Sequence, residues 1–199
     1  MGMAWDTDGT KRKIMAAATT EFAKRGPDGT TIERIAKLAG VNKERVYNYF
    51  GSKPALFAQV LRDQLSTAAE DVPLSPGTAE EIAEYAGRLY DYHRRHPELA
   101  RLLQWEALTI ADEVPEEELR REYYGRKSSV LATSQADGTV MRAIDPDLLH
   151  FHLVSLAGYW ALLPQVGRMI TGAAADEAED ARRRAGVVEA ARRLLAVQP

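Results

Sequence analysis

Between residues 42 and 48 the chain carries a short run of polar side chains whose types suit contacts with nucleic-acid bases. Lys43 and Arg45 can donate hydrogen bonds to the O6 and N7 atoms of guanine, and Asn42 or Asn48 can pair with adenine. A helix of about two turns is long enough to lie in the major groove of DNA with its first residues at the bases. If this run is such a helix, its exposed surface consists of Asn42, Lys43, Glu44, Arg45, Tyr47, Asn48 and Tyr49.

Other side chains in the same region suit the phosphates, which position a protein on DNA without specifying its sequence. The hydroxyls of Tyr47 and Tyr49 and the ammonium group of Lys53 can bind phosphate oxygens. Thr31 lies where a helix is expected to begin. The unpaired backbone N–H groups of a helix N-terminus, together with a hydroxyl, readily hold a phosphate.

Two short helices joined by a tight turn must position these side chains. The first is expected to begin with Thr30 and Glu33 in the spacing of a capping box, and the second to follow Asn42, a favourable N-cap. Gly40 can adopt the left-handed backbone that the turn needs, and Ala36 is small enough for the helices to cross closely. The core of this pair is expected to contain Ile35, Ala39, Val41 and Val46.

The order of residues here is similar to the DNA-binding signature of the TetR family of transcriptional regulators. It reads T-x-E-x-I-A-x-x-A-G-V and then Y-x-Y-F-x-S-K-x-x-L, and with Phe22 and Gly26 the resemblance covers about residues 10–57. The family often has small residues where this chain has residues 42–45, which leaves the operator sequence open. An alternative is a packed helical hairpin in an unrelated bundle. The matching residues are Thr31, Glu33, Ile35, Ala36, Ala39, Gly40, Val41, Tyr47, Tyr49, Phe50, Ser52, Lys53 and Leu56.

The apolar spacing is helical along almost the whole chain, which predicts an all-α protein. Asp145 is expected to cap the helix that begins at residue 146. We expect a flexible tail at residues 1–9 and a three-helix DNA-binding domain of the helix-turn-helix type at 10–54. A ligand-binding and dimerisation bundle at 55–199 is expected to be continuous with that domain. Beyond the two short helices, further helices are predicted at residues 10–25, 53–70, 78–96, 97–109, 115–135, 146–171 and 176–197.

Composition and charge narrow the possible classes of protein. The 199 residues include no cysteine, which excludes disulfides and thiolate metal sites, and this fits a reducing cytoplasm. The first ten residues contain no apolar run, so no signal peptide is expected. The net charge of −3 divides into +4 for residues 1–55 and −7 for residues 56–199. A basic end on an acidic body indicates that this end meets a polyanion.

The apolar stretch at residues 148–163 is expected to form a buried helix, because a membrane span needs about 20 apolar residues. It is apolar around most of its circumference, which is more than one buried face requires. The resemblance implies a homodimer in which the last two helices form a four-helix interface. The alternative is that both helices bury each other inside a monomer. The predicted interface residues are Leu153, Leu156, Ala157, Val187, Ala191, Leu194 and Leu195.

The C-terminal domain is also expected to hold a small ligand. A pocket that mixes tryptophan, tyrosine and acidic groups would suit a lipophilic cation through cation–π contacts, and the alternative is a neutral hydrophobic metabolite. Many of these aromatic residues could instead belong to the core. The candidate lining residues are Phe57, Leu61, Tyr90, His93, Leu102, Trp105, Glu106, Tyr123, Phe151, Tyr159 and Trp160.

The chain shows no pattern typical of an enzyme or a metal site. It has no G-x-S-x-G elbow, phosphate loop or H-E-x-x-H motif. His93 and His96 lie one helical turn apart without acidic residues at ligand spacing, so no metal and no cofactor is predicted. We expect a homodimeric repressor that leaves a palindromic operator on double-stranded DNA when a small hydrophobic or cationic effector binds. The alternatives are a regulator without such an effector, an activator, or an all-α enzyme.

Overall fold

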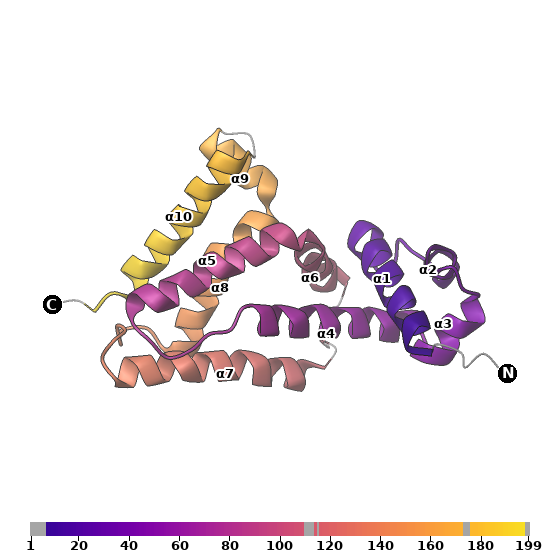
Figure 1. Cartoon of the computed structure of the whole chain (residues 1–199), viewed down its shortest axis with the longest axis horizontal. Helices are drawn as coiled ribbons and strands as arrows, with labels where there is room; N and C mark the ends of the chain where they lie inside the picture. The colour runs from indigo at the N-terminus through magenta and orange to yellow at the C-terminus, as the bar shows by residue number, and fades with distance from the viewer. Residues whose placement is uncertain (1–6, 110–113, 115, 173–175, 198–199) are drawn as a thin grey trace. The chain divides into compact units, whose positions relative to one another are not determined.

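All regular structure in the part of the chain that the structure describes is helical; this part comprises residues 7–109, 114, 116–172 and 176–197. The computed structural model (Figure 1) confirms the predicted all-α class. The chain divides into two compact units. One contains Met1–Ser66 and Arg101–Glu116, and the other contains Thr67–Ala100 and Glu117–Pro199. The division into domains at residues 10–54 and 55–199 stays a prediction.

The first unit gathers the N-terminal helices around a small apolar core. It contains α1 (Thr7–Arg25), α2 (Ile32–Ala39) and α3 (Lys43–Phe50), with most of α4 (Lys53–Asp71) and of α6 (Pro97–Thr109). Phe22 and Phe57 meet edge to face at the centre of this core, with their ring centroids 5.1 Å apart. The other fully buried core side chains come from all five helices and include Ile14, Ile35, Val46, Leu56, Leu61 and Leu102.

The second unit is a bundle of longer helices. It contains α5 (Ala79–Arg95), α7 (Glu117–Ala136), α8 (Pro146–Leu162), α9 (Pro164–Thr171) and α10 (Glu177–Leu195). Helix α5 packs against both α10 and α8, and α7 packs against α8. The approach of α5 to α10 requires a glycine, because a Cβ atom on Gly87 would lie 2.7 Å from a methyl group of Val188. Arg184 then joins the two helices by ion pairs with Glu84 and Asp91.

Most predicted helices are present, with small differences at their ends. Helix α1 begins at Thr7, so residues 7–9 of the predicted tail are helical, while residues 1–6 lie outside the described residues. The helix predicted from residue 115 begins at Glu117, and residue 115 also lies outside the described part. Asn42 caps α3 as predicted, with its side-chain oxygen accepting a hydrogen bond from the backbone N–H of Arg45 at 3.1 Å.

One predicted cap is wrong, and another lacks its side-chain hydrogen bond. The N-cap of α2 is Thr31, whose hydroxyl oxygen accepts from the backbone N–H of Arg34 at 3.3 Å. Thr30 instead is buried and donates its hydroxyl hydrogen to Glu21 at 2.8 Å, which a cap residue facing its own helix could not do. Asp145 is the N-cap residue of α8 as predicted, but its side chain makes no capping hydrogen bond.

The single helix predicted over residues 146–171 is also wrong. The structure has α8 and α9 in its place, because Pro164 cannot donate a backbone hydrogen bond and begins a new helix there. The expectation that residues 148–163 are buried holds for one face only. Leu149, Leu153 and Ala157 are fully buried, whereas Phe151 and Tyr159 are 67% and 53% exposed.

Candidate functional site

The turn between α2 and α3 has the backbone geometry that the sequence predicts. Gly40 lies in the left-handed region at φ 68° and ψ 33°. The backbone N–H of Val41 donates to the carbonyl oxygen of Ala36 at 3.0 Å, which closes the end of α2. A Cβ atom at Gly40 would meet nothing within 4 Å, so the glycine serves the backbone angle rather than close packing. Ile32, Ile35 and Val46 are buried beneath the turn.

Helix α3 presents most of the predicted base-reading side chains on one open surface. Val46 is 1% exposed and anchors the helix to the core of the first unit. The predicted residues that are exposed are Asn42, Lys43, Glu44, Tyr47 and Asn48, and those that are half-buried are Arg45 and Tyr49. The surface therefore combines amide, ammonium and guanidinium donors over two helical turns.

Lys43 lies beside a carboxylate on the neighbouring helix. Its ammonium nitrogen lies 3.6 Å from a carboxylate oxygen of Glu33, which is on the first turn of α2. The pKa of Glu33 is lowered, first by a hydrogen bond from its own backbone N–H and then by the hydroxyl of Thr31. Both side chains are more than half exposed, so solvent screens this ion pair strongly.

The two tyrosines of α3 differ in their surroundings. Tyr47 is 46% exposed. Tyr49 is half-buried and meets the ring of Phe50 edge to face, with the ring centroids 6.4 Å apart. Lys11 of α1 places its ammonium nitrogen 5.6 Å from the centre of the Tyr49 ring. Tyr49 therefore links the N-terminal part of α1 to α3.

A carboxylate network fixes the other end of this surface. Glu21 of α1 accepts hydrogen bonds from the hydroxyl of Thr30 at 2.8 Å and from Nε of Arg34 at 3.3 Å, and it lies 3.2 Å from Nε of Arg25. Lys53, the predicted phosphate ligand, donates from Nζ to the carbonyl oxygen of Thr30 at 3.3 Å. The loop before α2 is thus held from both α1 and α4.

The Glu21 network was missed by the sequence analysis, because its members are far apart in the sequence and follow no helical period. Burial acts to raise the pKa of the Glu21 carboxyl. Hydrogen bonds from Thr30 and Arg34 and the charge of Arg25 outweigh burial, so the pKa is lowered. Glu21 therefore stays ionised beside the candidate DNA-binding surface.

The predicted interface residues lie on two faces of α8 and α10. Leu153, Ala157, Val187, Ala191 and Leu195 are buried inside the second unit, where they pack within the single chain. Leu156 and Leu194 are half-exposed and line a groove of about 460 Å³ on the outer side of the same helices. The rest of the groove is lined by Ile144, His152, Ser155, Tyr159 and Ala190.

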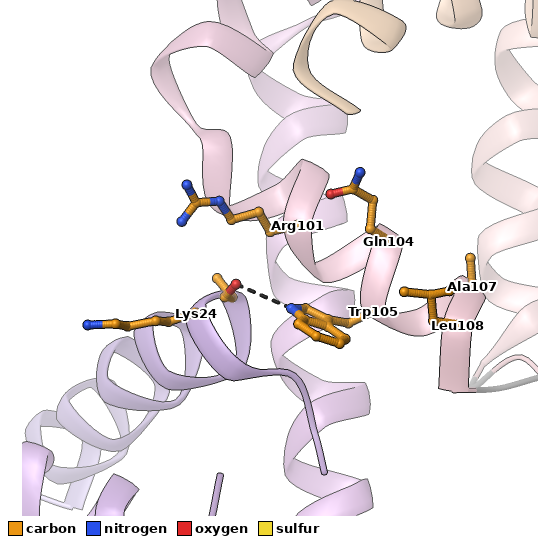
Figure 2. Close-up of a pocket in the computed structure, with 7 residues that line it drawn as sticks. Lys24, Arg101, Gln104, Trp105, Ala107 and Leu108 are labelled. Atoms are coloured by element: carbon orange, nitrogen blue, oxygen red, sulfur yellow. Dashed lines mark hydrogen bonds between the residues drawn. The ribbon is translucent and has the colours of Figure 1, made fainter. Parts of the chain in front are cut away.

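Within the first unit, most candidate ligand residues belong to the core. Phe57, Leu61 and Leu102 are at most 2% exposed and pack among α1, α2, α3 and α4. Glu106 is also buried. Trp105 lines a pocket of about 570 Å³ together with Ala23, Lys24, Arg101, Gln104, Ala107 and Leu108, as Figure 2 shows.

Within the second unit, the candidate ligand residues are scattered. Tyr90 is buried and its hydroxyl lies 3.4 Å from Asp180; burial is the main cause that raises its pKa to about 12. Phe151 and Tyr159 face solvent. Trp160 and Tyr123 each lie beneath an arginine, Arg183 at 5.1 Å and Arg126 at 4.7 Å from the ring centres.

His93 has an unusual position in this unit. Its Nδ1 atom is buried without a hydrogen-bond partner among the described residues, and burial lowers the pKa of the ring. Its Nε2 atom lies beside Gly158, 3.6 Å from the place that a Cβ atom there would occupy. His96, one turn further along, stacks on Tyr92 with ring centroids 4.4 Å apart.

Two other kinds of feature, a metal site and a membrane span, have no counterpart in the described part of the chain. No group of three or more histidine or acidic side chains there is placed to hold a metal ion. None of the described helices has the length and apolar character that crossing a membrane requires.

Comparisons with known families match both parts of the chain. A family model described as "Bacterial regulatory proteins, tetR family" matches residues 14–60. A second model, described as "Tetracyclin repressor-like, C-terminal domain", matches residues 81–193. The two matches cover the candidate DNA-binding helices and most of the second unit.

Individual relatives agree with these matches. The HTH-type transcriptional repressor SCO4008 of Streptomyces coelicolor is 40% identical over 194 residues, which are 96% of this chain and 98% of that protein. The HTH-type transcriptional regulator RutR of Escherichia coli K12 is 33% identical over 175 residues, covering 82% and 79% of the two chains. Among solved structures, the transcriptional regulator SCO4942 of Streptomyces coelicolor superposes with a TM-score of 0.81 at 32% identity, covering 94% of this chain and 98% of its own.

Proposed function

The chain belongs to the TetR family of DNA-binding transcriptional regulators, and on this premise we propose that it is a homodimeric repressor. It binds a palindromic operator in the cytoplasm and leaves it when a small hydrophobic or cationic effector binds the C-terminal domain. The observation that carries this proposal is the open polar face of α3, held by a capped turn and a buried valine. The name of the 40% identical relative, a transcriptional repressor, supports the sign of regulation.

In this proposal the side chains of unit 1 divide between bases and phosphates. Asn42, Lys43, Glu44, Arg45 and Asn48 face the base edges, because they lie on the first two turns of the exposed helix. Thr31 and Lys53 bind phosphates at the start of α2 and α4, beside Tyr47 and Tyr49. Lys53 already points its ammonium group at the loop before α2, so a phosphate held by the α2 N-terminus would lie near it.

A second copy of the chain is the proposed occupant of the outer groove on α8 and α10. Most of the side chains that line the groove are apolar, among them Leu156, Leu194 and the half-exposed Tyr159. In a dimer they would lie at the interface, while the buried residues Leu153, Ala157, Val187, Ala191 and Leu195 would support the two helices from inside. A dimer suits a palindromic operator, since two α3 helices about 34–36 Å apart reach successive major grooves.

The effector is proposed to bind within the second unit, and His93 is the feature that supports this. Its Nδ1 atom, which has no hydrogen-bond partner among the described residues, can hydrogen-bond a ligand group, and leaving such a buried nitrogen unpaired is costly. Hydrophobic effectors would gain from the apolar surroundings, and cationic ones from the neighbouring aromatic rings. An effector that prefers the state unable to bind DNA by about 1–3 kcal/mol lowers operator affinity roughly 5- to 150-fold.

The test measures binding to DNA from the promoter upstream of the protein's own gene. Fluorescence anisotropy on wild type and on Tyr47→Ala and Lys53→Ala should show specific binding that each substitution weakens. A thermal-shift screen of cationic dyes, antibiotics and fatty acyl compounds, repeated with this DNA, then identifies effectors. Equal binding by all three proteins would contradict the DNA contacts, and stabilising compounds that never release the DNA would contradict effector control.

A further inference from the structure

None of the residues that line the pocket between α1 and α6 has a role in the proposed repressor mechanism. The pocket walls are the last turn of α1, with Ala23 and Lys24, and the second half of α6, from Arg101 to Leu108. All of these residues belong to the first unit. The volume of about 570 Å³ is in the range of sites for small molecules, which is roughly 300–1,000 Å³.

Two cationic side chains border this pocket from opposite walls. In Figure 2, Lys24 of α1 and Arg101 of α6 extend toward the same open side. Neither makes an ion pair or a hydrogen bond with any other described residue, and none of the described residues that line the pocket carries a carboxylate. Other arginines of the same unit have acidic partners, such as Arg34 with Glu21 and Arg62 with Glu116. Two like charges on one pocket, without a counter-charge among its described lining residues, favour an anion there.

An indole ring forms the inner wall. The Nε1–H group of Trp105 donates to the carbonyl oxygen of Ala23 at 3.4 Å, as the dashed line in Figure 2 marks. A Cβ atom on Gly26 would lie 2.7 Å from the indole, so the ring is packed tightly against the chain that follows α1. Beside it, Leu108 is 77% exposed and Ala107 is also in solvent. The pocket thus has a rigid aromatic wall and an apolar end opposite its charged side.

We propose that this pocket binds a small organic anion with a flat apolar body and a carboxylate or phosphate head. The head lies between Lys24 and Arg101, whose guanidinium can hold it with two parallel hydrogen bonds. The body lies along Trp105 and Leu108. This site is separate from the effector site proposed in the second unit, and its existence does not depend on the repressor function.

The test titrates the full-length protein, without DNA, with 2-naphthoate and follows indole N–H signals in ¹H–¹⁵N NMR spectra. The sequence has three tryptophans, Trp5, Trp105 and Trp160, and Trp105→Phe assigns the signal of the pocket. We expect 2-naphthoate to shift the Trp105 signal in a saturable way and to leave the Trp160 signal in place. Calorimetry measures the dissociation constant of the complex between the protein and 2-naphthoate.

Variants and analogues separate this site from general attraction of anions. The double variant Lys24→Ala/Arg101→Ala should bind 2-naphthoate at least about tenfold more weakly, since hydrogen bonds to charged groups are lost. Lys13→Ala removes one exposed charge elsewhere on α1 and should bind as wild type does. Neutral 2-naphthalenemethanol and inorganic phosphate should both bind more weakly than 2-naphthoate. 2-Naphthyl phosphate shows which head group the pair of cations prefers.

Several results would overturn the proposal. One is the absence of binding at millimolar 2-naphthoate, and another is equal affinity in the double variant and wild type. Equal affinity for the neutral alcohol would show that the two cations do not contribute to binding. Equal affinity for inorganic phosphate would show that the aromatic body of the ligand does not contribute. If the double variant lost operator affinity while its affinity for 2-naphthoate stayed unchanged, the two cations would belong to the DNA contact instead.

Discussion

At the scale of single residues, Glu21 is expected to position the proposed DNA-binding surface without touching DNA. It accepts from Thr30 and Arg34, and Thr30 in turn accepts from Lys53, so the start of α2 and the start of α4 share one buried anchor. Glu21→Gln keeps the shape but removes the charge that holds Arg25 and Arg34. We expect weaker operator binding with an unchanged dependence of log Kd on log salt, because no phosphate contact is lost.

The salt dependence of operator binding should distinguish Glu21→Gln from Lys53→Ala. Losing a direct phosphate contact should reduce the salt slope by about 1. Asp28→Asn is the matched control, because Asp28 is exposed in the loop after α1 and its loss removes the same charge without touching the network. If Glu21→Gln and Asp28→Asn bind the operator equally well, Glu21 has no positioning role.

His150 is expected to make the folding stability of the protein depend on pH. It is 4% exposed, between the hydroxyls of Tyr85 and Ser128, each 3.4 Å from a ring nitrogen. Burial and then the charge of Lys127 lower the pKa of His150 to about 4. The unfolded chain therefore takes up the proton first, and stability is lost as pH falls from about 6.5 toward 4, by up to about 3 kcal/mol.

Urea unfolding at pH 7, 6, 5 and 4 measures this loss. His150→Gln should lose less stability than wild type across that range, whatever its stability at pH 7. Lys127, whose pKa burial lowers to about 8, changes charge above this window and does not confuse the result. His96→Gln, outside the cluster, should keep the wild-type profile. Parallel profiles for His150→Gln and wild type would show that His150 does not cause the acid sensitivity.

At the scale of elements, the helix-turn-helix could be predicted from the sequence because its signals are local. Gly40, Asn42 and Val46 each act within one turn of their own position, and the structure places all three as expected. The sequence did not show which of Thr30 and Thr31 caps α2. Thr31 accepts from the α2 backbone because the hydroxyl of Thr30 binds Glu21, which lies on another helix. Pro164 is also a local signal, in this case for a helix boundary. The apolar run around it favoured one continuous helix instead.

The faces of α8 and α10 could not be predicted, because their outcome depends on packing between distant segments. Leu194 and Leu195 are adjacent and chemically alike, yet one lines the outer groove and the other is fully buried. A stripe of apolar residues does not show whether the same chain or a second copy covers it. For the same reason, the sequence did not show that Phe57 and Leu61 belong to the core rather than to a ligand pocket.

Replacing Gly40 by alanine tests the role of this glycine in the turn between α2 and α3. An alanine there has space but must adopt φ near 68°, which costs about 1–2 kcal/mol. Gly125→Ala is the control, since Gly125 is exposed inside α7 and has equal space, so alanine should stabilise that helix by about 0.5–1 kcal/mol. Chemical denaturation compares both with wild type. Changes of the same sign in the two variants would contradict the assigned role of Gly40.

At the scale of the whole molecule, the proposed dimer connects the outer groove to the operator. Leu194→Glu places a charge in this apolar groove without altering the buried side of α10. Burying an unpaired carboxylate between two copies costs several kcal/mol, so we expect a folded monomer in sedimentation velocity. Binding to the full operator should fall steeply, because each monomer then reaches only one half-site.

Ala185→Glu is the matched control for the added charge. Ala185 is exposed on α10 nine positions before Leu194, which places it on the opposite side of a helix with 3.6 residues per turn. This variant should stay dimeric and bind the operator as wild type does. On a DNA fragment with a single half-site, wild type, Ala185→Glu and Leu194→Glu should all bind with similar, weak affinity, because α3 is unchanged. A dimeric Leu194→Glu would place the interface on another surface, and a monomer with full operator affinity would remove the need for the dimer.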